Sequence, residues 1–434
     1  MSEANRSELS AGATRYALGM LTLAYAFNFI DRQILVILQV PIKEEMGLMD
    51  WQLGLLSGFA FALIYVTAGI PIAYWADRGN RRNIIALAVT VWSGMTALSG
   101  MATNFSQLLL ARVGVGLGEA GGSPPAHAMI SDYFPPERRA SALGFYSAGL
   151  HFGIMLGFVL GAFIEEALGW RAAFMAVGIP GVLFAAIFFM TVKEPERGRW
   201  DSAGASDYKP SLGETFSFLA KVRSFWLISV GCGLTAFGGY GVGNFLPVFM
   251  NRSHGVEGIE LGLIMAIGGG GAGLAGTLLG GRLADHLGLR DRRWYLGVPM
   301  AAGLIALPIL FPFLLSGQTT LVIALMVIVT MLTNTYLGPC LATCHGLVPP
   351  AMRALTSAIL FFILNLIGLG MGPLTAGLLS DYFTQSYGDD GLRYALVVIG
   401  CIAALGVIPF LLAIRSLPGD LARAEAQVEA ANAN

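Results

Sequence analysis

Charged residues are scarce in this chain of 434 residues. They make up 12% of it, whereas hydrophobic residues make up 55%. A soluble globular domain carries about 25% charged residues, so the composition excludes an ordinary soluble domain and favours a helical membrane protein with many spans. The formal net charge of −1 says little, because the placement of charges matters more than their sum. We expect no nucleic-acid partner.

Several motifs of soluble enzymes and secreted proteins are also missing. The four cysteines all lie in apolar runs, and the sequence has no CxxC pair or His/Cys metal spacing, so we interpret them as small buried side chains and expect no metal site. No GxxxxGK[ST] loop is present, which argues against ATP dependence, and no nucleophile–base spacing suggests an enzyme. The first residues lack a charged region followed by a cleavage site, which predicts no cleaved signal peptide.

Long apolar runs dominate instead. About twenty apolar residues can cross a bilayer as a helix, and this criterion predicts twelve spans: 15–40, 51–76, 83–102, 106–132, 139–164, 171–191, 224–250, 260–284, 294–315, 319–347, 353–381 and 392–415. The one long polar interruption, 192–223, predicts a linker that contains a short surface helix near 212–220. We therefore expect an all-α membrane protein with two six-helix bundles, 15–191 and 224–415, and tails at 1–14 and 416–434.

The placement of lysine and arginine predicts the orientation, because these residues accumulate in cytoplasmic loops. If the N-terminus is cytoplasmic, most of the 26 fall in cytoplasmic segments. Only four lie in the opposite loops: Lys43, Arg171, Arg252 and Arg393. The sequence thus predicts a multi-pass protein of the cell (inner) membrane with both termini in the cytoplasm.

The two halves of the chain resemble each other. A shift of 214 residues places Pro125 on Pro339 and Arg139 on Arg353, and a shift of 208 places the Ala-Asp of WADR on that of LADH. Matched halves with a substrate site at their interface are a transporter design.

The stretch 111–139 carries two ionisable residues, Arg112 and Glu119, within an apolar span. Seven residues separate them, so they share a helix face about 10 Å apart. Three glycines between them allow close approach of another helix, and Pro124 and Pro125 predict a kink just beyond Glu119. A charge in a span costs about 2.5–3.5 kcal/mol on insertion scales, so these residues are expected to have a use.

Asp31 and Arg32 lie deep in the first span. Neighbouring residues on a helix point about 100° apart, so the two cannot both face one partner. One interpretation is a structural salt bridge, Asp31–Arg112 or Arg32–Glu119. The other is a proton-coupling set in which Asp31 and Glu119 titrate and Arg112, which cannot deprotonate, is the fixed counter-charge.

The second half has no equivalent of these charges. Its interior polar residues and aromatics are candidates to bind substrate with Arg32 and Arg112, although each aromatic alone is better explained by helix packing: Phe237, Tyr240, Asn244, Thr333, Asn334 and Asn365. Charged residues at the cytoplasmic ends are candidate gates, although topology explains part of them: Asp77, Arg78, Arg81, Arg82, Arg139, Asp285 and Arg353. His127 is a weak candidate for proton relay.

Twelve spans in two repeats, with a turn motif after the second and eighth spans, resemble the major facilitator superfamily. Within it, Asp31-Arg32, Arg112 with GVGLGEAG, and the continuation SPP…DYFPPERR resemble spinster-like lipid transporters, and the short loops suggest a bacterial member. The resemblance implies alternating access by two rocking bundles, with protonation of Asp31 and Glu119 beside Arg112 driving the switch. Ala73 departs from the glycine usual in the first turn motif.

The leading hypothesis is a proton-coupled secondary transporter of an amphipathic, lipid-like molecule such as a lysolipid or a sphingolipid-like compound. An arginine freed by protonation would hold an anionic head group, and the apolar second half would hold the tail. The alternatives are a proton-coupled symporter of a small organic anion and a multidrug exporter. We expect no cofactor besides protons, membrane lipids as partners, and a monomer.

Overall fold

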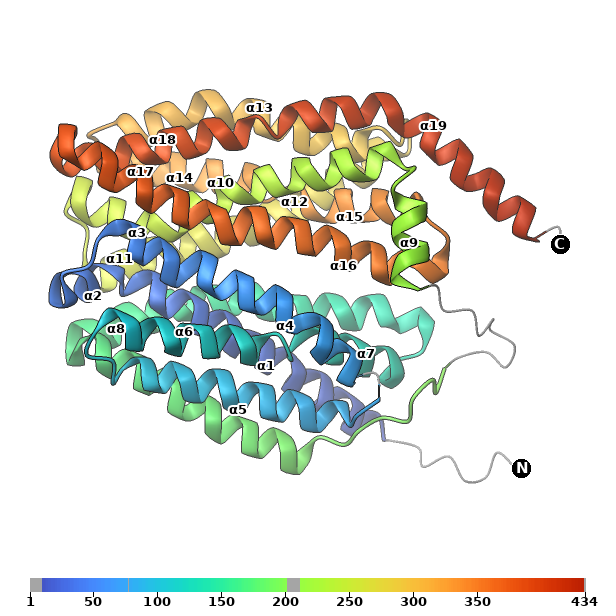
Figure 1. The fold of residues 1–434 in the computed structure, drawn as a ribbon, viewed down its shortest axis with the longest axis horizontal. Coiled ribbons are helices and arrows are strands. Elements are labelled where there is room, and N and C mark those ends of the chain that lie inside the picture. The colour runs from blue at the N-terminus through green and yellow to red at the C-terminus, as the bar shows by residue number, and fades with distance from the viewer. Residues whose placement is uncertain (1–9, 77, 201–210, 433–434) are drawn as a thin grey trace. The chain divides into compact units, whose positions relative to one another are not determined.

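The computed structural model describes residues 10–76, 78–200 and 211–432, and every regular element in them is a helix (Figure 1). The first half contains α1 (Ala11–Ile37), α2 (Gln39–Met46), α3 (Asp50–Gly54), the π-helix η2 (Leu55–Phe59), α4 (Ala60–Ala76), α5 (Arg81–Ser99), α6 (Phe105–Glu119), α7 (Ser123–Tyr133) and α8 (Pro136–Thr191).

The described residues of the second half also form only helices. It contains α9 (Leu212–Leu219), α10 (Arg223–His254), α11 (Gly258–Met265), the π-helix η3 (Ala266–Gly271), α12 (Ala272–Gly288), α13 (Trp294–Leu315), α14 (Thr319–Thr333), α15 (Leu337–Gly346), the 3-10 helix η4 (Pro350–Met352), α16 (Arg353–Leu364), the π-helix η5 (Asn365–Met371), α17 (Gly372–Tyr387), the 3-10 helix η6 (Gly388–Asp390), α18 (Gly391–Ala404) and α19 (Val407–Asn432). The expected surface helix near 212–220 is therefore present as α9.

The helices follow the predicted spans closely. Within the described residues, eight helical stretches are long and apolar enough to cross a membrane. The two longest, Pro136–Thr191 and Arg353–Arg423, each cover two of the expected spans, while α5 and the α6–α7 pair occupy two others. The break in α8 falls at Gly169, whose φ of 80° and ψ of 164° are not helical. Glycine tolerates this backbone conformation, so the chain can leave one span and begin the next there.

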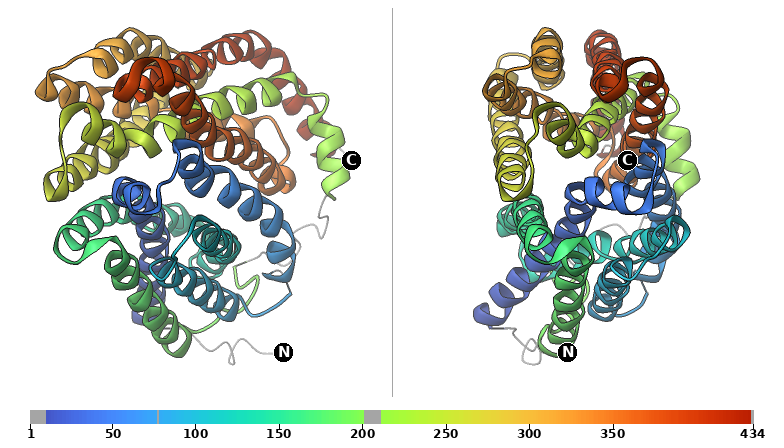
Figure 2. Two further views of the ribbon diagram at one scale, coloured as in Figure 1. Left: turned by 60° about the vertical axis from the view of Figure 1, so that its left-hand side comes forward. Right: turned by 90° about the vertical axis from the view of Figure 1, so that its left-hand side faces the viewer.

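Contacts between residues divide the chain into two compact units. Unit 1 comprises 1–34 and 67–205, and unit 2 comprises 35–66 and 206–434. In unit 1, α5 packs against α6 and α8. In unit 2, α10 runs alongside α16 and α17 and also contacts α19 (Figure 2). The segment 35–66, which contains α2, α3 and η2, packs with the elements of the second half.

The internal repeat is visible in the helix boundaries. Helix α6 ends at Glu119 and α7 begins at Ser123, whereas α14 ends at Thr333 and α15 begins at Leu337, so both breaks fit the shift of 214 residues. The kink expected beyond Glu119 is confirmed.

The same shift relates two arginine contacts. Arg139 donates a 2.9 Å hydrogen bond to the carbonyl oxygen of Ser131, and Arg353 donates a 3.3 Å bond to that of His345. In each half, an arginine at the start of one helix thus caps the C-terminal end of the preceding helix, where cations are favoured.

A hydrophobic core fixes the end of unit 2 that joins the linker. Leu219 of α9 is fully buried against Phe225 of α10, and α9 contacts α16 (Figure 1). Asp420 of α19 accepts hydrogen bonds from the backbone N–H and the hydroxyl group of Ser224 at 2.9 and 2.7 Å. A carboxylate at a helix N-terminus satisfies otherwise unpaired N–H groups, so α19 anchors the start of α10.

Candidate functional site

The predicted charges of the first half meet inside unit 1. Arg32 on α1 donates a hydrogen bond from Nε to Glu119 Oε2 at 2.7 Å, and the Glu119 side chain is fully buried. The Arg32 side chain retains 15% exposure, and its guanidinium lies 5.0 Å from the ring centroid of Phe29. Of the two salt bridges that the sequence left open, the structure forms Arg32–Glu119. A charge-assisted bond in a buried site is among the stronger polar contacts.

Asp31 takes different neighbours, as the 100° offset predicts. Its side chain is completely buried, and neither carboxylate oxygen makes a well-formed hydrogen bond with any residue in the described part of the chain. It interacts electrostatically with Glu119 and Arg112, and the hydroxyl group of Thr96 on α5 lies near it. Arg112 is buried with 2% exposure and interacts with both carboxylates. Two acids and two arginines therefore share one site.

Close packing of α5 on α6 brings neutral side chains to this site. Gly118 on α6 faces the backbone of Trp92 on α5, and a Cβ atom at Gly118 would stand 2.6 Å from the Trp92 nitrogen. The glycines between Arg112 and Glu119 were expected to allow such an approach, and Gly118 does. The contact places Trp92 beside the break between α6 and α7, since its ring atoms also lie 3.4 and 3.7 Å from a Cβ atom at Gly122.

The substrate candidates of the second half lie on two helices and a π-helix of unit 2. Phe237 and Asn244 are buried on α10 and Tyr240 is half-buried between them. Asn244 donates to the carbonyl oxygen of Tyr240 at 2.8 Å. At the end of α14, Thr333 and Asn334 likewise donate to carbonyl oxygens of their own helix. These amide and hydroxyl groups thus already donate hydrogen bonds to carbonyl oxygens of their own helices, in addition to any role with a ligand.

Asn365 begins the π-helix η5, where the backbone departs from α-helical geometry. Short π-helical turns within longer helices occur frequently at functional sites. Two further π-helical turns, η2 and η3, interrupt the second and eighth spans. No residue pattern indicated these π-helical turns in advance.

Arg81 is the best-anchored of the predicted gate residues. Its guanidinium donates to Asp132 at 2.6 Å and to Glu194 at 2.7 Å, and Glu194 also accepts from the backbone N–H of Arg82 at 2.8 Å. Burial disfavours the charged form of Arg81, but the hydrogen bonds that it donates to Glu194 and Asp132 outweigh this effect and raise its pKa. Arg81 precedes the expected span. The cluster ties the start of α5 to the end of α7 and to the first linker residues.

The other gate candidates make local contacts. Arg78 lies 3.6 Å from the ring centroid of Tyr74, and Arg82 lies 4.8 Å from that of Phe189. Asp285 accepts a hydrogen bond from the hydroxyl group of Tyr295 at 2.9 Å. Arg139 and Arg353 form the helix caps described above. Asp77 lies outside the described residues.

Sequence reasoning missed a second charged cluster, in unit 2. Asp50 is buried with 1% exposure and pairs with Lys43 at 2.6 Å and with Arg252 at 2.6 and 2.7 Å. Ser380 donates to the same carboxylate at 2.6 Å, and Asp381 accepts from the backbone N–H groups of Asp50 and Trp51. The available signal was the position of both acids at the ends of predicted spans, opposite the linker.

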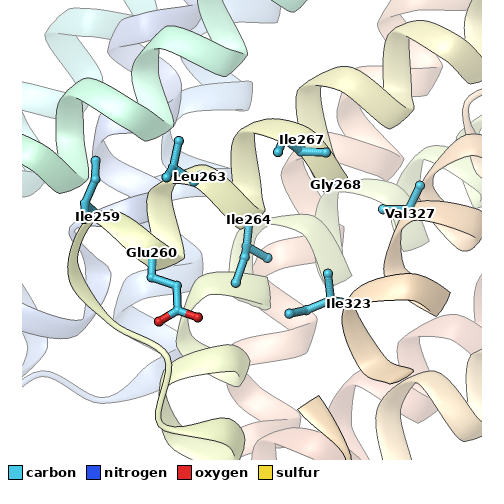
Figure 3. A pocket seen from close by; sticks show the side chains of 8 residues that line it. All are labelled: Ile259, Glu260, Leu263, Ile264, Ile267, Gly268, Ile323 and Val327. Atoms are coloured by element: carbon cyan, nitrogen blue, oxygen red, sulfur yellow. The ribbon is translucent and has the colours of Figure 1, made fainter. Parts of the chain in front are cut away.

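An apolar groove of about 330 Å³ lies on α11, η3 and α14 of unit 2 (Figure 3). Leu263, Ile264, Ile267 and Ile323 contribute to its wall, and Glu260 is its one acidic lining residue. None of the predicted site residues lines it.

The fold and the site together define a class. Membrane-spanning helices in two repeat-related halves, with buried ion pairs inside one half, are the architecture of a multi-pass transporter. The profile of the Major Facilitator Superfamily matches residues 21–369. The chain therefore belongs to this superfamily, and it is a transporter rather than an enzyme.

Solved structures support the spinster resemblance. A bacterial homologue of the human lysosomal transporter Spinster, solved in an inward-facing and unoccupied conformation, matches with a TM-score of 0.88 and 33% identity, covering 95% of this chain and 99% of that chain. The expected relationship to spinster-like transporters is confirmed.

Curated relatives differ in what they transport. An MFS-type efflux pump of Mycolicibacterium smegmatis is 32% identical over 92% of both chains. The probable L-galactonate transporter of Escherichia coli is 25% identical over 93% of this chain and 90% of the relative. The mouse sphingosine-1-phosphate transporter SPNS2 is 26% identical over 94% and 78%.

Proposed function

We propose that this protein is a proton-coupled secondary transporter of an anionic, amphipathic lipid-like molecule, working by alternating access. The buried charge set of unit 1 carries the proposal. Arg32 holds Glu119 directly, while Asp31 lies buried beside Arg112 without a well-formed hydrogen bond to a described residue. Protonation of Glu119 would neutralise one partner of the 2.7 Å ion pair, and Arg32 would then become available to an anionic head group.

The second half supplies the apolar part of the proposed substrate site. Phe237 and Tyr240 lie on one helix, and the amide of Asn244 donates within that helix. A lysolipid or a sphingoid phosphate has the matching chemistry, with one anion and one long tail. The similarity to SPNS2 and to the Spinster homologue supports this substrate class.

The proposed setting is the cell's inner membrane, with both termini and the linker in the cytoplasm. Most lysines and arginines fall in the termini, the linker and the loops predicted to lie on the same side of the membrane, and the positive-inside rule makes that side cytoplasmic. In this proposal the protein acts as a monomer surrounded by membrane lipids, and protons are its only coupling ion.

The test is flux into proteoliposomes that contain the full-length protein. An imposed pH gradient should drive accumulation of a fluorescent lysophospholipid, and Glu119→Gln and Asp31→Asn should each abolish the pH-driven part. Tyr387→Phe, at an exposed position of unit 2 that is not part of the charge set, is the control. If both acid variants retain full pH-driven flux, the coupling assignment is wrong.

A small organic anion is the second candidate, because the galactonate transporter is also a relative and the 15% exposure of Arg32 leaves its guanidinium within reach of a carboxylate. Competition separates the two substrates. An excess of a sugar acid should leave lysolipid flux unchanged under the leading proposal. Strong inhibition by the sugar acid, together with pH-driven uptake of that acid, would favour the second candidate.

A further inference from the structure

A small cavity lies within unit 1, lined by residues of α1, α5, α7 and α8 and of the break that follows Glu119. Its volume of about 10 Å³ is room for about one water molecule. Half of its lining residues have polar side chains: Tyr25, Asn28, Trp92, Ser123 and Tyr146. These side chains offer hydroxyl, amide and indole groups as hydrogen-bond partners for a water there.

Trp92, which lines this cavity, and Glu119, which interacts with the lining residue Asn28, each have a buried polar atom without a well-formed hydrogen bond to a described residue. The indole N–H of Trp92, a residue with 1% exposure, makes no hydrogen bond to the described residues, and neither does Oε1 of Glu119. Asn28 links the two regions, because it lines the cavity and its amide also faces the Glu119 carboxyl group. A buried indole N–H usually has a partner, and a water in this cavity would provide one.

A row of aromatic rings leads from the cavity to an exposed residue. Tyr146 stacks on Tyr25 with ring centroids 4.5 Å apart, and His127 meets the same Tyr146 ring edge-on at 5.3 Å. His127 is exposed and lies on α7, on the linker side of the break that follows Glu119. The row therefore connects the cavity lining to an exposed residue of α7.

The geometry at Glu119 decides which oxygen can receive a proton. Oε2 accepts the hydrogen bond from Arg32, whereas Oε1 accepts no well-formed hydrogen bond from a described residue. The charged groups that act on this carboxylate are Arg32 from α1 and Arg112 from α6, and Asp31 of α1 also interacts with it. Helix α5 contributes the neutral Trp92 beside it. A proton can therefore bind Oε1 first, while Oε2 still accepts the hydrogen bond from Arg32. The Arg32 contact would break in a later step.

We propose that this cavity holds a water molecule that relays protons between Glu119 and the linker end of unit 1. Asn28 and Trp92 position this water, and protons enter the relay from the side of His127. The inference rests on the proposed proton coupling. In the uptake direction, a hydronium ion at the entrance gives one proton to the cavity water, which passes one of its own protons to Oε1. The water is left neutral, Glu119 becomes a neutral carboxylic acid, and Arg32 keeps its charge.

Proton uptake by the full-length protein in detergent tests this relay. A rapid jump from alkaline to acidic buffer is followed with a soluble pH-indicator dye, so no transport substrate is needed. The variants are Asn28→Leu, which removes the amide at similar volume, and Trp92→Phe, which removes the indole N–H. Asn28→Ser keeps a polar group, and Trp170→Phe removes another buried indole of unit 1 as the matched control. Glu119→Gln identifies the uptake phase that belongs to this carboxyl group.

We expect Asn28→Leu and Trp92→Phe to slow the Glu119-dependent phase about tenfold or more without reducing the number of protons taken up, because positioned proton transfer contributes on that scale. Asn28→Ser and Trp170→Phe should keep the wild-type rate. If the two test variants take up protons at the wild-type rate, the relay is wrong while proton coupling stands. A smaller amplitude at an unchanged rate would instead show a structural role and overturn the relay. If the wild-type protein has no Glu119-dependent phase, proton coupling itself fails.

Discussion

Arg252 donates two hydrogen bonds to the carboxylate of Asp50, from Nη1 to Oδ2 at 2.7 Å and from Nη2 to Oδ1 at 2.6 Å. Such a two-pronged contact fixes orientation as well as distance. Asp50 also accepts hydrogen bonds from Lys43 and from the hydroxyl group of Ser380. A single buried acid at the start of α3 thereby connects α2, α3, α10 and α17 of unit 2.

Removal of the Arg252 partner should be costly. We expect Arg252→Gln to lower the free energy of unfolding by about 3 kcal/mol, because a buried carboxylate then keeps fewer compensating charges. Unfolding of the purified protein in detergent measures the change. The exposed pair Asp291–Arg293, 3.9 Å apart, is the control, and Arg293→Gln should change stability by less than about 0.5 kcal/mol. Equal effects of the two substitutions would contradict a structural role for the Asp50 cluster.

The Arg81 cluster is expected to hold the first linker residues against unit 1. Arg81→Gln removes hydrogen bonds to Asp132 and Glu194, so the residues after α8 should detach from unit 1. Limited trypsin digestion should then cut after Arg197 or Arg199 at least several times faster than in the wild type, since cleavage follows the population of the open form.

Arg82→Gln is the comparison for this digestion. Its guanidinium bonds only to the neighbouring Asn83 among the hydrogen bonds described, while its backbone N–H keeps the bond to Glu194. Digestion of this variant should match the wild type. If Arg81→Gln is cut no faster than Arg82→Gln, the cluster does not hold the linker.

Much of the fold was predictable because a bilayer imposes simple constraints. Apolar runs of about twenty residues and polar interruptions predicted the helices, and Pro124 and Pro125 predicted the break after Glu119. The superfamily also followed from the repeat and its motifs. The π-helical turns could not be predicted, because they depend on how neighbouring helices pack rather than on a residue pattern.

The candidate site was likewise predictable in part from the sequence. Buried charges in spans are rare enough to identify Asp31, Arg32, Arg112 and Glu119 from the sequence alone. The sequence could not decide that Glu119 binds Arg32 directly, because 87 residues separate the two and only packing brings them together. Asp50 was missed for a related reason: an acid at the end of a span looks like a surface residue until Arg252 is seen to cover it.

The two acids of unit 1 should respond differently to neutralisation. Glu119→Gln removes a charge-assisted hydrogen bond to Arg32, so it should lower stability by about 1.5–3 kcal/mol. Asp31→Asn removes a buried charge whose oxygens accept no well-formed hydrogen bond from the described residues, so its cost should be smaller. Thermal unfolding of both variants in detergent checks the order, and a larger loss for Asp31→Asn would contradict the observed pairing.

Gly118 should be intolerant of even one added methyl group. A Cβ atom there would stand 2.6 Å from the backbone nitrogen of Trp92, and backbone cannot move aside as a flexible side chain can. We expect Gly118→Ala to cost about 1–3 kcal/mol through overpacking and to abolish pH-driven flux, because α5 would be pushed away from Asp31 and Glu119.

Gly144 on α8 is the matched control for this substitution, since no atom lies within 4 Å of a Cβ atom built there. Gly144→Ala should be neutral or stabilise the helix by up to about 1 kcal/mol. Unfolding and flux are measured on both variants in the same detergent and lipid. If Gly118→Ala folds with wild-type stability and transports normally, the close contact of α5 with α6 does not position the buried charges, and the site must tolerate a looser arrangement of its helices.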